Sequence, residues 1–183
     1  TLVVVPTMLT DPRNIGDLVE ALEVRFLANR DPHLHFGLLT DYRDAPAESL
    51  PGDEALLSLA RQGIEELNDR YRGPEAGPFF LFHRPRRWNP LERVWMGYER
   101  KRGKIAELIS FLHAGAQGVS KERFSLIVGD TAILSDVKYL ITLDTDTQLP
   151  RDSAWQFVGA MAHPLNRPQY DEDKGRVVAG YSI

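Results

Sequence analysis

Short apolar runs alternate with longer amphipathic stretches along the chain. Five of these runs are rich in β-branched or aromatic residues and have the length of strands buried in a sheet. We expect strands at 2–5, 34–39, 79–82, 124–128 and 139–143, with a sixth at 177–183. Strands that alternate with helical stretches are typical of a mainly parallel sheet covered by helices.

The stretches between these runs carry apolar residues at helical spacing. One stripe consists of Leu18, Leu22 and Phe26, and a second of Leu56, Ala60, Ile64, Leu67 and Tyr71. We expect the two helices to follow N-caps at Asn14 and Asp53, and two further helices at about 97–112 and 152–162. The pattern predicts an α/β fold with a mainly parallel sheet flanked by helices, and no internal repeat interrupts it.

Length and composition fit one folded domain over residues 1–183, because 43% of the residues are hydrophobic and 26% are charged. The absence of cysteine excludes disulfides and thiolate metal sites. The apolar runs span only a few residues, whereas a membrane-spanning helix needs ~20. The chain begins at Thr1 with a strand-like run and shows no signal peptide, so we expect it to be a piece of a longer protein.

Charge is distributed unevenly along the chain, whose formal net charge is −4. Residues 83–104 contain eight Lys and Arg against two Glu, so this segment carries +6 and the remainder −10. A solvated helix surface and a phosphate-binding wall both explain such a segment. Trp88 and Trp95 within it also suggest nucleic acid, but the net acidity of the chain argues against a broad nucleic-acid interface.

The most informative motif is the acidic pair that follows the apolar run 139–143. Asp144 and Asp146 are expected at the carboxyl edge of the sheet, where open α/β sheets bind their ligands. Two neighbouring carboxylates repel each other unless a cation or a shared proton lies between them. A hard divalent metal that bridges to a diphosphate meets this need, so we predict a metal–diphosphate site here.

The acidic pair has three other possible interpretations. An EF-hand loop is excluded because Leu149 and Trp155 occupy the positions that require Gly and Glu. A phosphatase of the haloacid dehalogenase type stays a weaker alternative, since that family has Thr or Val where this chain has Gln148 and places the motif near the start of the fold. A simple helix-capping role for Asp146 or Asp152 also stays open.

A second acidic strand end follows the run 34–39. Asp41 is expected at the same edge of the parallel sheet as the acidic pair, which suggests one crevice. A carboxylate there can accept the imide N–H of a uracil ring or bond a ribose hydroxyl. Capping of the next turn is the alternative, and it applies more to Asp44 than to Asp41.

The glycines near the end of the basic segment do not form a phosphate-binding P-loop. The spacing from Gly97 to Gly103 is one residue too long, and Ile105 replaces the Ser or Thr that binds magnesium. Motifs of zinc proteases, serine hydrolases and dinucleotide-binding folds are also absent from the sequence. We expect His83 and His163, which lie close to prolines, to serve loop packing rather than catalysis.

The order of these motifs resembles the nucleotide-sugar glycosyltransferases of GT-A fold. A first strand ends in Val5-Pro6-Thr7, and Asp41, a helix start near Lys104 and Asp144-x-Asp146 follow in that order. Three longer strings resemble the transferase domain of cyclic β-1,2-glucan synthases: LEVRFLANRD at 22–31, WMGYERKRGK at 95–104 and ITLDTDTQLPR at 141–151.

This resemblance implies the Rossmann-like nucleotide-binding half of an inverting enzyme that transfers glucose from UDP-glucose into β-1,2-glucan. Asp144 and Asp146 are then expected to hold Mg²⁺ or Mn²⁺ against the diphosphate. Asp41 is expected to read the uracil or ribose, and Lys104 with a neighbouring arginine to face the phosphates. Pro6 and Thr7 are expected to line the nucleotide floor.

The resemblance also implies what lies outside the chain. The general base and the acceptor-binding helices are expected after Ile183, so the 183-residue chain is expected to be inactive alone. Flanking membrane helices and a separate carbohydrate-active domain are implied for the parent, which places this domain on the cytoplasmic face of a bacterial inner membrane. A function of another class stays open, namely a non-catalytic module that binds a nucleotide or a partner without turnover.

Overall fold

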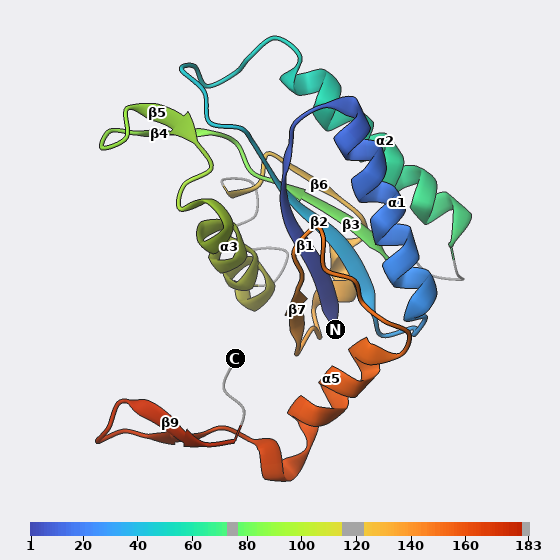
Figure 1. Ribbon diagram of the computed structural model, residues 1–183, viewed down its shortest axis with the longest axis vertical. Helices are drawn as coiled ribbons and strands as arrows, with labels where there is room; N and C mark the ends of the chain where they lie inside the picture. Colours follow the sequence, from blue (N-terminus) through green and yellow to red (C-terminus); the bar gives the residue numbers. More distant parts are fainter. Residues whose placement is uncertain (73–76, 115–122, 181–183) are drawn as a thin grey trace.

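The computed structural model describes residues 1–72, 77–114 and 123–180, and shows a central sheet with helices on both faces (Figure 1). In chain order the strands and α-helices are β1 (Leu2–Leu9), α1 (Pro12–Ala28), β2 (His35–Tyr42), α2 (Asp53–Arg70), β3 (Phe79–His83), β4 (Arg87–Asn89), β5 (Val94–Met96), α3 (Arg100–Ala114), β6 (Leu126–Val128), β7 (Leu140–Thr142), α5 (Ser153–Ala162), β8 (Gln169–Asp171) and β9 (Arg176–Ala179). The α/β fold predicted from the sequence is confirmed.

The central sheet has five strands in the order β6-β3-β2-β1-β7. β1, β2, β3 and β7 run parallel, and β6 runs antiparallel to β3 at one edge. β1 extends to Leu9, beyond the predicted end at Val5, because Pro6 continues the strand in register with Leu39 of β2. The carboxyl ends of β1, β2 and β7 therefore lie at one edge of the sheet.

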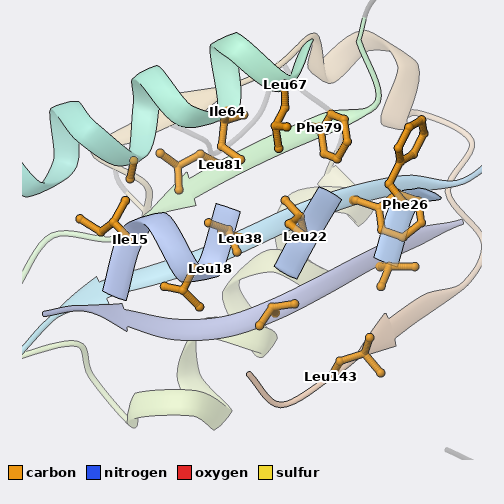
Figure 2. Packing of buried hydrophobic residues seen from close by; sticks show 14 of the residues in the cluster. Ile15, Leu18, Leu22, Phe26, Leu38, Ile64, Leu67, Phe79, Leu81 and Leu143 are labelled. Atoms are coloured by element: carbon orange, nitrogen blue, oxygen red, sulfur yellow. The ribbon is translucent and has the colours of Figure 1, made fainter. Parts of the chain in front are cut away.

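Each face of the sheet has its own apolar core, which explains why the central strands are almost continuously apolar. On one face, α1 and α2 pack their predicted stripes against β1, β2 and β3 (Figure 2). On the other face, Leu108 and Phe111 of α3 pack against Phe80 and Phe82 of β3. The helices thus fix the strand ends that carry the candidate site.

The predicted N-caps differ from the observed ones. The carboxylate of Asp11 caps α1 by accepting the backbone N–H of Asn14 at 3.0 Å, so Asn14 lies inside the helix. Gly52 occupies the N-cap position of α2, and Asp53 is its first residue. Pro12 explains the first difference, because proline is favoured in the first turn of a helix.

Three features of the second half differ from the predicted elements. β4 and β5 form a hairpin that was not predicted, and α3 begins at Arg100 rather than near Gly97. The expected strand at 177–183 is observed as β9, which pairs antiparallel with β8 and not with the central sheet, while residues 181–183 lie outside the described part. In the described part of the chain, no helix is both long and apolar enough to span a membrane.

Candidate functional site

A pocket of about 290 Å³ lies where the carboxyl ends of β1 and β2 meet the start of α3. Its lining residues are Pro6, Thr7, Met8, Asp41, Tyr42, Asp44, Gly97, Arg100, Lys101, Lys104 and Thr145. Pro6, Thr7, Asp41 and Lys104, predicted from separate motifs, are thus brought together. Thr145, between the two aspartates of the acidic motif, reaches the same pocket.

A buried cluster of charges forms one wall of this pocket. The carboxylate of Asp41 accepts two hydrogen bonds from Arg84, at 2.8 Å and 3.0 Å. The Lys104 ammonium lies 2.9 Å from Asp41 and donates a hydrogen bond of 2.5 Å to the carbonyl of Thr7. Burial lowers the pKa of Lys104, and the Asp41 carboxylate opposes this effect. Lys104 therefore ties α3 to the ends of both β1 and β2.

Arg84 also orders the turn that precedes α3. Its guanidinium donates hydrogen bonds of 3.2 Å to the carbonyls of Tyr98 and Arg100. A Cβ atom at Gly97 would overlap the Asp41 carboxylate and lie 3.0 Å from the Arg84 guanidinium. Glycine at position 97 therefore allows the turn to close over the buried ion pair.

The basic segment 83–104 does not form a single surface. Arg84 and Arg86 are buried. Arg86 pairs with Asp53, and its guanidinium lies 4.8 Å from the centre of the Tyr42 ring. Arg100 is exposed and pairs with Asp44 and Glu92, whereas Arg102 is 85% exposed and lies 3.6 Å from Glu99. The segment combines buried ion pairs, part of the pocket wall and a solvated helix face, so the solvated surface accounts for only part of it, and phosphate binding stays a prediction.

The acidic motif follows β7 and lies beside α3. Asp144 forms an ion pair with Lys101, and both side chains are more than half exposed. The side chain of Asp146 is also exposed. Lys101 therefore joins the acidic motif to the helix that supplies Lys104, one turn further along.

Two buried arginines support the site and were not singled out from the sequence. Arg84 holds Asp41, as described above, and Arg25 of α1 donates hydrogen bonds to the carbonyls of Thr145 and Thr147 at 2.9 Å and 2.7 Å. In the sequence, Arg25 lies within the segment 22–31 that resembles cyclic β-1,2-glucan synthases, and nothing else indicates it. No local pattern marks a buried arginine whose partners are 120 residues away.

The donor set of the acidic motif is of the type that a hard divalent metal prefers. Within residues 1–72, 77–114 and 123–180, no group of three or more His, Cys, Asp or Glu side chains could hold a metal by itself. Asp144 and Asp146 offer exposed carboxylate oxygens, the ligand type that Mg²⁺ and Mn²⁺ prefer.

A larger pocket of about 610 Å³ lies beside the first and is lined by the start of α2 and by Arg86. It contains none of the predicted site residues, and Arg86 is fully engaged there by Asp53 and by the carbonyls of Arg43 and Glu48. The smaller pocket, where the predicted residues converge, is therefore the candidate site.

No protein-family model matches the chain. Among proteins of known function, it is 40% identical over all 183 residues to the cyclic beta-(1,2)-glucan synthase NdvB of Rhizobium meliloti (strain 1021). The chain spans only 6% of the length of that relative. The resemblance to cyclic β-1,2-glucan synthases is thereby confirmed from end to end of the chain, as similarity to one short segment of such an enzyme.

Proposed function

We propose that the chain is the donor-binding part of an inverting glycosyltransferase that transfers glucose from UDP-glucose into β-1,2-glucan. The observation that carries this proposal is the convergence of Asp41 and Lys104 in one pocket, with the Asp144-x-Asp146 motif at its rim. The similarity to a glucan synthase supports the same reaction class.

The cations at this edge of the sheet suit a diphosphate. Lys101 and Lys104 both lie in the first turns of α3, where the helix dipole adds partial positive charge. Lys104 is buried and fixed, whereas Lys101 is half exposed and can reach an incoming ligand. A nucleoside diphosphate therefore meets one rigid and one adaptable cation.

Asp144 and Asp146 would hold Mg²⁺ or Mn²⁺ between the protein and the diphosphate. When bound, such a metal offsets the negative charge that develops on the UDP leaving group. The role of Lys101 is to neutralise Asp144 before the ligand arrives. Two carboxylates that face a diphosphate without any cation would repel it.

Asp41 is the proposed contact to the nucleoside. Arg84 and Lys104 occupy its oxygens from the protein interior, and a carboxylate has about four lone-pair positions. A position on the pocket side can accept the imide N–H of uracil or a ribose hydroxyl. Pro6 and Thr7 would form the floor below it.

The remaining parts of the reaction lie outside these residues in our proposal. The general base and the acceptor site would follow Ile183, so the chain by itself would bind the donor without making glucan. The whole enzyme would work at the cytoplasmic face of a bacterial inner membrane, through segments of the longer protein. A binding module without turnover is the alternative of another class.

Calorimetry with a panel of nucleotides tests the proposal. In the presence of Mn²⁺, we expect UDP and UDP-glucose to bind and ADP and GDP to bind at least tenfold more weakly. Asp144→Asn should remove binding, whereas Asp152→Asn, an exposed carboxylate at the start of α5, should not. Equal binding of all nucleotides would contradict the donor assignment, and hydrolysis of p-nitrophenyl phosphate would favour the phosphatase alternative.

A further inference from the structure

We propose that Arg25, assisted by Asn29, holds the Asp144-x-Asp146 loop in its binding position, and that Arg25 is thus a positioning residue for the metal–nucleotide site. This inference rests on the proposed function and adds to it the residues of α1 that hold the main chain of the loop. Arg25 lies in the last turns of α1 and Asn29 is the C-cap of this helix, which lies on the side of the loop opposite to α3 (Figure 1).

Arg25 donates its hydrogen bonds to the main chain of the loop. Its guanidinium donates to the carbonyl of Thr147 twice, at 2.7 Å and 3.1 Å, and to that of Thr145 at 2.9 Å. A longer contact of 3.5 Å reaches the carbonyl of Asp144. One side chain therefore bonds to main-chain carbonyls on both sides of Asp146, and these bonds use neither carboxylate of the motif.

The buried charge of Arg25 is compensated by backbone carbonyls. Only 5% of the residue is exposed, yet within the described residues no Asp or Glu forms an ion pair with it. Backbone carbonyls alone offset the buried charge, which is a costly arrangement. The fold therefore keeps a buried guanidinium at the place where it holds the main chain of the acidic loop.

Asn29 anchors the second half of the same loop. Its amide donates to the carbonyl of Leu149 at 3.1 Å, and its side-chain oxygen accepts the backbone N–H of Ala154 at 3.1 Å. The backbone N–H of Asp152 bonds to the carbonyl of Ala28 at the end of α1. The loop from Asp144 to the start of α5 is thus attached to α1 along its whole length.

This attachment makes a specific prediction about metal affinity. A loop that is already fixed places its two carboxylates without further loss of conformational freedom when the metal binds. Residues that orient metal ligands from behind typically change metal affinity by about 10- to 100-fold when they are replaced. We therefore expect Arg25→Met to weaken Mn²⁺ binding by at least about tenfold, and Arg25→Lys, which keeps the charge but fewer hydrogen bonds, to lie between Arg25→Met and the wild type.

The test is a titration of the full chain with Mn²⁺ in the presence of UDP, followed by electron paramagnetic resonance. Arg86→Met is the matched control, because Arg86 is equally buried and bonds to Asp53 and to backbone carbonyls remote from the acidic motif. We expect both Met variants to lose stability in urea, and only Arg25→Met to lose Mn²⁺ affinity. Unchanged affinity in Arg25→Met, or an equal loss in Arg86→Met, would overturn the inference.

Amide hydrogen exchange separates this inference from the proposed function. If the wild type binds no Mn²⁺, the proposed function fails, and exchange at residues 144–148 still measures the anchoring. We expect faster exchange there in Arg25→Met than in Arg86→Met, and equal exchange in the two would contradict the anchoring. Arg25→Lys provides both measurements if Arg25→Met does not fold.

Discussion

The ammonium of Lys104 lies 2.9 Å from the carboxylate of Asp41, and both side chains are almost fully buried. This ion pair joins the start of α3 to the end of β2, and Arg84 completes it from the other side. Buried ion pairs are sensitive to the loss of one partner, because the other charge is left without compensation. The pocket wall is therefore a structural element, and in our proposal it also contacts the ligand.

We predict that Lys104→Met weakens both the fold and ligand binding. Removing one partner of a buried pair costs about 3 kcal/mol of stability, and losing a charged hydrogen bond to the diphosphate weakens UDP binding by roughly 1–3 kcal/mol. Urea unfolding and calorimetry measure the two effects. Arg102→Ala, at a side chain that is 85% exposed, should change neither, and wild-type stability in Lys104→Met would contradict the burial of this ammonium.

We expect Lys101→Met to strengthen the binding of Mn²⁺ when no nucleotide is present. In our proposal Lys101 competes with the metal for Asp144, and exposed ion pairs such as Lys101–Asp144 are weak. Without the competitor, Mn²⁺ alone should bind up to about fivefold more tightly. Lys138→Met removes an exposed cation before β7 and controls for overall charge, and weaker Mn²⁺ binding in Lys101→Met alone would contradict the competition.

Glycine 97 should not tolerate a side chain. We expect Gly97→Ala to destabilise the protein by about 1–3 kcal/mol, because the added methyl group would displace Asp41 or Arg84. Gly16→Ala is a control of opposite sign, since its Cβ meets no atom within 4 Å and alanine favours the interior of α1 by about 0.5–1 kcal/mol. Urea unfolding measures both, and equal effects would disprove the close approach at Gly97.

Stability should fall as the pH falls from about 6.5 to about 4, partly because of His83. Burial lowers the pKa of His83 to about 4, and its Nδ1 is 2.8 Å from the Thr40 hydroxyl. The unfolded chain therefore binds more protons than the folded one over this range, which lowers stability as the pH decreases.

His83→Gln measures this contribution, because glutamine does not titrate. It should reduce the slope of unfolding free energy against pH by up to about 1.4 kcal/mol per pH unit between these values. Burial also lowers the pKa of His35 to about 4. The part of the slope that His35 contributes should therefore remain in His83→Gln. An unchanged slope in His83→Gln would show that His83 does not become protonated on unfolding.

The sequence predicted the parts of the fold that depend on local patterns. Helical stripes such as Leu18, Leu22 and Phe26 pack as expected, because apolar residues at this spacing must share one face. Asp41 and Asp144 lie at one edge because parallel strands end on the same side of a sheet. The hairpin of β4 and β5 was missed, since strands of three residues carry no periodic signal.

The supporting side chains could not be predicted in the same way. Arg84 meets Asp41 43 residues away, and Arg25 meets the acidic loop about 120 residues away, so neither interaction has a local signature. Buried arginines look like surface residues in a sequence, because arginine is mostly exposed. Only the three-dimensional arrangement shows these two contacts.

Binding of UDP with and without a divalent metal tests the central claim most directly. Calorimetric titration of the chain with UDP should give binding in Mn²⁺ or Mg²⁺ and none in EDTA, because Asp144 and Asp146 repel the diphosphate unless a metal lies between them. Asp146→Asn should weaken binding in Mn²⁺ to the level seen in EDTA. UDP affinity that is equal with and without metal, or unchanged by Asp146→Asn, would contradict the assignment of the acidic motif as a metal–nucleotide site.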